Sequence, residues 1–254
     1  MNLELDERVA LVTGSSQGIG SATAAQFAAE GAYVAVTYRQ ERERAEAIVN
    51  EIRSNDGEAF AVHLDLASFD SITQARDAVV KKWGKIDILV NNAIEWGPRL
   101  IAQAPPFESL APEEWQPLLR ANIEGTFRLI QTVVPYMRTR KWGRIVNVSS
   151  IVAEDGLPGT GWYATAKASL HGLTRTLSKE LGPSGILVNA LMPGLTETGR
   201  TANIGPEARR RVEENSPIRR ILHPDDVAHV IVFLCSAKNS AITGEILRAS
   251  GGRV

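Results

Sequence analysis

The sequence has little of what marks secreted, membrane-bound or polyanion-binding proteins. Cys235 is its one cysteine, so no internal disulfide can form, and the thiol lies in an apolar run where a small buried side chain is expected. The formal net charge is −1, which gives no general attraction for nucleic acid or an anionic membrane. No apolar run is long enough to cross a bilayer, and residues 1–8 lack the features of a signal peptide. We therefore expect a cytoplasmic protein that binds neither nucleic acid nor membranes.

What the chain has in quantity is apolar sequence arranged with the rhythm of an α/β protein. Hydrophobic residues make up 44% of its 254 residues, which is enough for a large buried core. Short runs rich in valine and isoleucine alternate with longer amphipathic stretches, as in parallel sheets that helices cover on both faces. We predict an α/β Rossmann fold, a doubly wound, seven-stranded parallel sheet in a three-layer α/β/α sandwich, forming a single domain over residues 1–254. The expected strands are residues 9–13, 33–38, 59–64, 86–91, 144–149, 186–191 and 245–248.

Glycines stand just before four of these strands. A helix often ends with a glycine in the left-handed conformation, because glycine has no Cβ and meets no steric penalty there. We expect this conformation at Gly31, Gly84, Gly143 and Gly182.

Residues 195–222 break the alternation of strands and helices. They follow the sixth expected strand and are rich in charge, with three consecutive arginines at residues 209–211. This position puts them over the carboxyl ends of the strands, where open α/β sheets bind ligands. The segment is predicted to be a substrate lid, although a solvated amphipathic helix explains the same charge pattern.

A glycine-rich loop joins the first expected strand to the first helix. Residues 13–20 have the sequence T-G-S-S-Q-G-I-G. Glycines let backbone amides approach a pyrophosphate, and the N-terminus of the following helix supplies N–H donors and the positive end of its dipole. A lone glycine-rich loop often marks only a tight turn, but its place between strand and helix favours dinucleotide binding. The residues expected to contact the dinucleotide here are Gly14, Ser16, Gln17, Gly18, Ile19 and Gly20.

The residues that close the second expected strand predict which dinucleotide binds. A carboxylate there binds the ribose 2′-hydroxyl of NAD, whereas an arginine pairs with the 2′-phosphate of NADP. This chain has Tyr38 followed by Arg39, while Glu41 and Glu43 come later and are expected to face solvent beside the arginines of the same helix. We predict a preference for NADP(H) over NAD(H), with contacts from Tyr38 and Arg39, unless Arg39 is only a surface residue. Gln17 supplies no second cation.

Tyr163 and Lys167 are four residues apart, so they share one face if their segment is helical. A phenol titrates at about pH 10 in isolation, and a nearby ammonium stabilises the phenolate, which makes tyrosine a usable acid and base near neutral pH. The Y-x-x-x-K spacing alone is a common chance match, and a core tyrosine beside a surface lysine would explain it as well.

Taken together, the motifs resemble the short-chain dehydrogenase/reductase family along the whole chain. The loop at residues 13–20 matches T-G-x-x-x-G-x-G, residues 91–93 match the start of N-N-A-G, and residues 193–198 match P-G-x-x-x-T. Their overall run is most similar to the 3-oxoacyl-(acyl carrier protein) reductase-like branch. The resemblance implies further cofactor contacts: Asp65 beside the adenine, and residues 193–198 beside the nicotinamide. The full set of these contacts is Asp65, Leu66, Asn92, Ala93, Pro193, Gly194, Thr196 and Thr198.

The resemblance also implies a catalytic set. Ser150 would hold the substrate carbonyl oxygen, and strand alternation is expected to point the adjacent Ser149 to the other face. Tyr163 would donate a proton as hydride passes from the nicotinamide to the carbonyl, and Lys167 would also bind the nicotinamide ribose. Asn122 would hold a water that links Lys167 to solvent, although the same stretch is typical of a helix irregularity. The implied enzyme is an oxidoreductase acting on CH–OH and C=O groups.

One position departs from the family pattern. Ile94 stands where glycine usually follows N-N-A, and its β-branched side chain restricts the backbone near the expected adenosine ribose. Glu95, Trp96 and Trp162 are expected to rim the substrate cleft, and an indole beside Tyr163 favours an apolar or aromatic substrate.

The expected substrate is a small carbonyl or alcohol compound, and two kinds of protein partner follow from the resemblance. Acyl carrier protein is a candidate, because relatives receive this acidic protein on basic residues near the cleft; here Lys141 or the arginines of the predicted lid are available. A homotetramer is expected, because relatives commonly form one. Two other functions stay open, an alcohol or sugar dehydrogenase acting oxidatively with NAD(P) and a non-catalytic dinucleotide-binding module. The four histidines show no spacing typical of metal ligands, so no catalytic metal is expected.

Overall fold

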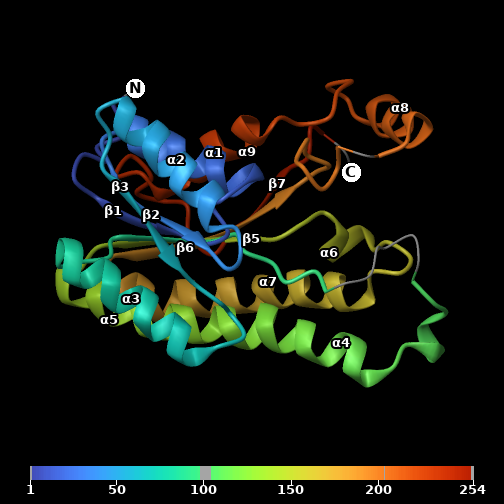
Figure 1. Ribbon diagram of the computed structural model, residues 1–254, viewed down its shortest axis with the longest axis horizontal. Helices are drawn as coiled ribbons and strands as arrows, with labels where there is room; N and C mark the ends of the chain where they lie inside the picture. The colour runs from blue at the N-terminus through green and yellow to red at the C-terminus, as the bar shows by residue number, and fades with distance from the viewer. Residues whose placement is uncertain (1, 98–103, 203, 253–254) are drawn as a thin grey trace.

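The structure, a computed structural model, describes residues 2–97, 104–202 and 204–252. Within these residues, seven strands form one parallel sheet: β1 (Val9–Val12), β2 (Tyr33–Tyr38), β3 (Ala59–His63), β4 (Ile88–Asn91), β5 (Gly143–Val148), β6 (Ile186–Pro193) and β7 (Ile246–Ala249). Their order in the sheet is β3-β2-β1-β4-β5-β6-β7 (Figure 1). Each strand begins and ends within two residues of its expected position, and the predicted Rossmann-type α/β fold is confirmed.

Helices cover both faces of this sheet (Figure 1). On one face lie α1 (Gly18–Ala29), α2 (Arg42–Ser54) and α9 (Pro224–Cys235), and on the other α3 (Phe69–Trp83), α5 (Thr126–Arg140) and α7 (Gly161–Leu181). The core has two parts, one on each face, because successive strand residues point to opposite sides: Leu11 belongs to one part and Val12 to the other. None of the helices in the described ranges has the length and apolarity needed to cross a bilayer.

Shorter helices stand around the cleft. α4 (Pro112–Leu119) leads into a π-helical segment (Arg120–Gly125), which continues into α5, so the expected helix irregularity is present. α6 (Val152–Asp155) follows β5. α8 (Pro206–Asn215) begins with a proline, whose missing N–H is not needed in the first turn.

The left-handed conformation predicted at four glycines occurs at two of them, Gly31 and Gly84. At the end of α5 it is taken by Lys141, and Gly143 instead begins β5. After α7 a short 3₁₀ turn continues the chain, so the positive φ falls at Gly185 and not at Gly182. An added Cβ at Gly185 would lie 2.3 Å from the carbonyl oxygen of Lys141, so this close approach requires glycine.

The predicted lid, described at residues 195–202 and 204–222, follows β6. It contains α8, and no residue of α8 is buried. Its two ends meet: Thr196 and Leu222 form an isolated parallel bridge, and the amide of Glu197 donates to the carbonyl of Leu222 at 2.8 Å. The segment is thus a solvated helix on a closed base, and its action as a lid stays a prediction.

Candidate active site

The glycine-rich loop forms a close-packed cradle at the start of α1. An added Cβ at Gly20 would lie 2.3 Å from the carbonyl oxygen of Gly14, and one at Gly14 would lie 2.8 Å from Cα of Ala93 in the loop after β4. No side chain among the described residues caps α1, and its first turn holds no acidic residue. The N–H groups at this helix end and its dipole therefore suit an anion, as the pyrophosphate prediction requires.

Thr13 and Asn92 tie the loops after β1 and β4 together. The Thr13 hydroxyl accepts the amides of Asn92 and Ala93 at 2.8 and 2.9 Å and donates to the carbonyl of Val90 at 3.1 Å. The Asn92 side chain donates to the carbonyls of Thr13 and Gly14 at 2.9 and 3.2 Å. The side chain of Asn92 is therefore used in holding the cradle together.

The end of β2 carries the residues predicted to choose the dinucleotide. Arg39 forms an ion pair with Glu95, which comes from the other side of the cleft, after β4. Arg44, expected only as a solvent-facing residue, donates to the Gln17 side chain at 2.9 Å and lies 3.3 Å from Glu41. Sequence reasoning missed Arg44 as a second cation beside the loop; its place in the first turn of α2 was the available signal.

Asp65 and Leu66 follow β3 at the same edge. Asp65 Oδ1 accepts the amide of Ala67 at 2.9 Å, a turn that holds the carboxylate beside its own loop. Leu66 packs closely on the π-helical segment, where an added Cβ at Gly125 would lie 2.2 Å from the Leu66 carbonyl oxygen. The predicted adenine contacts and the segment that carries Asn122 are therefore mechanically linked.

Ser150, Tyr163 and Lys167 come together at the carboxyl ends of β5 and the first turns of α7. Tyr163 lies close enough to Ser150 for the serine hydroxyl to lower the pKa of the phenol. Burial raises the pKa of Tyr163, while the hydroxyl of Ser150 and the charge of Arg200 oppose that rise. Lys167 is 5% exposed and donates from Nζ to the carbonyl of Val148 at 2.6 Å. Burial lowers the pKa of Lys167 to about 8, so keeping this side chain charged in the site costs free energy.

Asn122 lies buried in the π-helical segment, and both polar atoms of its side chain are hydrogen-bonded. Its side chain accepts the amide of Glu95 and donates to the Glu95 carbonyl, both at 2.8 Å. Beside it, a cavity of about 10 Å³, close to the size of one water, is lined by Asn122, Asn91 and Lys167. Asn91 Oδ1 is buried there without a hydrogen-bond partner among the described residues. One water near Lys167 fits this space, and its predicted link to solvent stays a prediction.

Ser149 does not share the place of Ser150. Its hydroxyl donates to the Lys167 carbonyl at 2.9 Å and meets Nε2 of His171 at 2.9 Å. Because its one proton goes to that carbonyl, His171 must donate through Nε2 as a neutral ring, in line with the pKa of His171, which burial lowers. The hydroxyl of Ser149 is therefore occupied by two partners on α7.

Two tryptophans, Trp96 and Trp162, contact the Tyr163 ring, where the rim of the cleft was expected. Trp96 stacks on the Tyr163 ring, with centroids 4.6 Å apart and planes inclined by 18°. Trp162 meets Trp96 edge to face at 6.0 Å. The guanidinium of Arg200 lies 3.9 Å over the Trp96 ring. No local sequence pattern predicts this stack, because it joins three segments that are distant along the chain.

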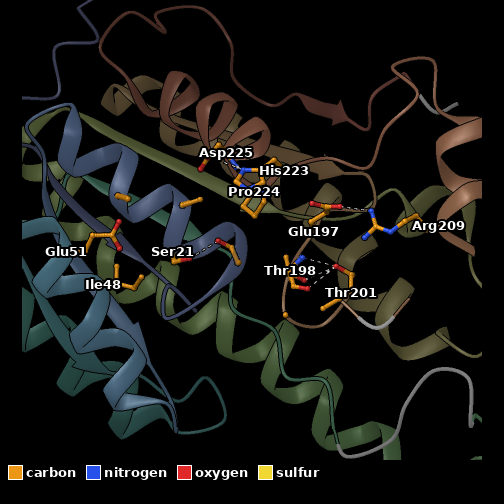
Figure 2. Close-up of a pocket in the computed structure, with 15 residues that line it drawn as sticks. Ser21, Ile48, Glu51, Glu197, Thr198, Thr201, Arg209, His223, Pro224 and Asp225 are labelled. Carbon is orange, nitrogen blue, oxygen red and sulfur yellow. Dashed lines mark hydrogen bonds and ion pairs between the residues drawn. The ribbon is translucent and has the colours of Figure 1, made fainter. Parts of the chain in front are cut away.

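A cavity of about 700 Å³ lies beside the N-terminus of α1 (Figure 2). Its walls come from α1, α2, the start of α9 and the first part of the predicted lid. An added Cβ at Gly18 would lie 3.1 Å from Cγ2 of Thr198. Thr198 is fixed by Thr201, whose hydroxyl accepts the Thr198 amide at 2.8 Å and donates to the carbonyl of Thr196 at 2.7 Å. Gly18 of the glycine-rich loop therefore lines one cavity together with Glu197 and Thr198, and the path of a dinucleotide through it stays a prediction.

Other predicted or singled-out residues take structural places. The amide of Gly194, directly after Pro193, donates to the carbonyl of Ala249 at 3.0 Å and joins β6 to β7. Cys235 is buried, as expected, and burial raises the pKa of its thiol. Within the described residues, no three histidine, cysteine or acidic side chains are grouped as metal ligands would be.

Comparison with known proteins agrees with this site. A family model described as enoyl-(acyl carrier protein) reductase matches residues 14–253. The 3-oxoacyl-(acyl-carrier-protein) reductases FabG of Aquifex aeolicus and Thermotoga maritima are 40% and 37% identical to this chain, each over 99% of it and over 99% and 100% of their own lengths. Among solved structures, a 7α-hydroxysteroid dehydrogenase complexed with NADH and 7-oxo glycochenodeoxycholic acid has a TM-score of 0.92 at 35% identity, covering 100% of this chain and 96% of that one. A dehydrogenase/reductase from Sinorhizobium meliloti has a TM-score of 0.90 at 34% identity, over 99% and 97% of the two chains.

The fold, the site and these relatives define an oxidoreductase that acts on CH–OH and C=O groups. The chain belongs to the short-chain dehydrogenase/reductase family, and the expected resemblance to 3-oxoacyl-(acyl carrier protein) reductases extends over nearly its whole length.

Proposed function

We propose that this enzyme reduces a ketone to an alcohol with NADPH, and that Tyr163 donates the proton. The observation that carries the proposal is the approach of Tyr163 to Ser150 at the carboxyl edge of the sheet, with Lys167 buried one helical turn further along α7. Two hydroxyls that meet in a partly buried site can together bind one carbonyl oxygen.

The cleft fits a dinucleotide on its own chemistry. The uncapped start of α1 and the close approach at Gly14 and Gly20 form an anion cradle, and two arginines lie where a 2′-phosphate is expected. When bound, NADPH supplies the hydride. The residues proposed to hold it are Gly14, Ser16, Gln17, Gly18, Ile19, Gly20, Tyr38, Arg39, Asp65, Leu66, Asn92, Ala93, Tyr163, Lys167, Pro193, Gly194, Thr196 and Thr198.

In the proposed reaction, the substrate oxygen accepts hydrogen bonds from Ser150 and Tyr163. Tyr163 passes its proton to that oxygen as negative charge develops there, and Ser150 continues to donate. The Lys167 ammonium stabilises the phenolate that is left; with a pKa of about 8 it is still mostly charged at pH 7. The proton returns from solvent through Lys167 and a water beside Asn122. Oxidation of an alcohol would use the same groups in reverse.

The proposed preference for NADP(H) rests on Arg39 and Arg44. Arg39 directly follows β2, where the 2′-phosphate is expected, and Arg44 is held beside the loop by Gln17. Each arginine also faces a carboxylate, Glu95 or Glu41. The preference is therefore expected to be moderate.

A 3-oxoacyl thioester is the proposed substrate class, because the relatives named above reduce 3-oxoacyl groups on a carrier protein. The docking of such a carrier on this chain has weaker support. Lys141 precedes β5 and so lies at the opposite edge of the sheet from Ser150, which corrects its proposed use at the cleft. Arg209 and Arg210 of the lid pair with Glu197 and Glu214 within α8 and its base. A free thioester is thus the first substrate to test.

The test is a screen of NADPH consumption with the purified enzyme. 3-Oxoacyl thioesters, oxosteroids, cyclic ketones, quinones and sugars are compared with an enoyl thioester, and the reverse reaction is assayed with the matching alcohols. We expect the highest kcat/KM for a ketone, with 3-oxoacyl thioesters leading. Turnover of the enoyl thioester alone, or of no carbonyl compound at all, would overturn the proposal.

We also propose that the enzyme is a cytoplasmic homotetramer. Phe127 at the start of α5 and Phe69 at the start of α3 are 47% and 48% exposed, which is unusual for large apolar side chains and suits burial by another subunit. Light scattering that gives the mass of a monomer would remove the tetramer.

A further inference from the structure

Glu95 lies across the cleft from Arg39 and is held firmly in that place. Its backbone N–H and C=O are both bound by the Asn122 side chain at 2.8 Å. Its carboxylate is held as well, since Oε1 accepts the amide of Gly97 at 3.1 Å and Oε2 pairs with Arg39. Two contacts therefore hold the backbone of Glu95, and two more hold its carboxylate.

The ion pair between Arg39 and Glu95 lies at the edge of the cleft and is partly screened from water. The Glu95 side chain is 23% exposed and that of Arg39 is 42% exposed, so the carboxylate in particular is screened from water. No other ion pair of Arg39 or Glu95 occurs among the residues that the structure describes. In this state the guanidinium is neutralised by the protein itself.

A 2′-phosphate at Arg39 would meet this carboxylate. The phosphate needs the same guanidinium donors, and its charge is of the same sign as that of Glu95. A ribose 2′-hydroxyl does not need the guanidinium donors and is not repelled by Glu95, because it is neutral and can donate to a carboxylate. Glu95 therefore acts against NADP(H) and leaves NAD(H) nearly unaffected.

We infer that Glu95 is a cofactor-selectivity residue: it competes with the 2′-phosphate for Arg39 and so narrows the preference for NADP(H). The inference rests on the proposed function, in which Arg39 faces that phosphate. Glu95 follows Ile94, the residue that stands where the family pattern has glycine.

Glu95→Gln tests the inference, because glutamine keeps the size and the acceptor for the Gly97 amide but not the charge. Dissociation constants for NADPH and NADH are measured by fluorescence titration, without turnover. The Kd for NADPH is expected to fall about fivefold, while that for NADH changes by less than about twofold. Glu46→Gln is the matched control, because Glu46 pairs with Arg42 on the exposed side of α2 and its loss removes the same charge.

The same substitution in an Arg39→Ala background separates competition from simple repulsion. We expect Glu95→Gln to leave the ratio of the two Kd values unchanged there, since the shared guanidinium is gone. An equal tightening in both backgrounds, or an unchanged ratio in the single variant, would overturn the inference. If the wild-type enzyme binds NADPH and NADH and Arg39→Ala changes neither Kd, the proposed role of Arg39 is overturned instead. Thermal unfolding of each variant checks that all are folded.

Discussion

At the residue scale, burial acts in opposite directions on Tyr163 and Lys167. It raises the pKa of the phenol and lowers that of the ammonium to about 8. Both shifts disfavour the charged form, so the phenol keeps its proton at pH 7 while the buried ammonium of Lys167 stays charged at a cost in free energy. Arg200, held over the Trp96 ring, acts the other way on Tyr163 and lowers its pKa.

Lys167→Met measures what this buried charge costs. A pKa lowered from 10.5 to about 8 means that the folded state binds the proton less well than the unfolded state, a penalty fully present below pH 8 and lost as the pH rises to 10.5. After allowing for the lost hydrogen bond to Val148, we expect the variant to be more stable than wild type by about 1 to 2 kcal/mol at pH 7. The difference should shrink towards pH 10. Urea unfolding at both pH values checks it, with exposed Lys179→Met as control; a difference independent of pH would refute the assigned cause.

Residue types at the site could be predicted from the sequence, but their contacts could not. The spacing of Tyr163 and Lys167 and the place of Ser150 after a strand follow from local patterns, and the structure brings all three together. The ion pair of Arg39 with Glu95 joins loops 56 positions apart in the chain, and no local pattern reports on it. Trp96 was expected at the cleft rim, yet its stacking on Tyr163 depends on the path of the loop after Ile94.

At the scale of elements, the π-helical segment connects the two ends of the cleft. It carries Asn122, which holds the loop after β4, and it packs through Gly125 on Leu66, which is proposed at the adenine. The extra residue per turn of such a segment is a frequent feature of functional sites. The sequence predicted an irregularity here but not its kind, because one additional residue in a turn leaves the apolar periodicity almost unchanged.

Gly125→Ala tests this close packing. Its Cβ would lie 2.2 Å from the Leu66 carbonyl, a backbone atom that cannot move by itself, so the segment and the β3–α3 loop must separate. We expect a loss of about 2 kcal/mol in the free energy of unfolding and weaker NADPH binding. Gly172→Ala is the control, because Gly172 lies on the exposed face of α7 with no atom near its Cβ, and it should gain up to about 1 kcal/mol. Equal effects of the two substitutions would contradict the packing argument.

At the scale of the whole molecule, the strands and their number follow from the sequence, because both faces of the sheet are covered and each strand is a short apolar run. The order of the strands needs more, since pairing joins distant residues such as Ala10 with Ile88 and Ala190 with Ile246. The order was therefore not predicted and comes from the structure. The lid could be placed after β6 from its charge, but its closed base depends on a bridge between Thr196 and Leu222 that only the fold reveals.

The central claim is that Tyr163 is the proton donor of a carbonyl reductase. Its most direct test is Tyr163→Phe, measured for NADPH binding and for ketone reduction with the best substrate of the screen. We predict that NADPH binds within about threefold of wild type while kcat falls by about 100- to 10 000-fold, because a phenyl ring keeps the stacking with Trp96 but has no proton to give. Tyr136→Phe, on α5 and away from the cleft, should leave both unchanged. Near-normal reduction by Tyr163→Phe would contradict the account.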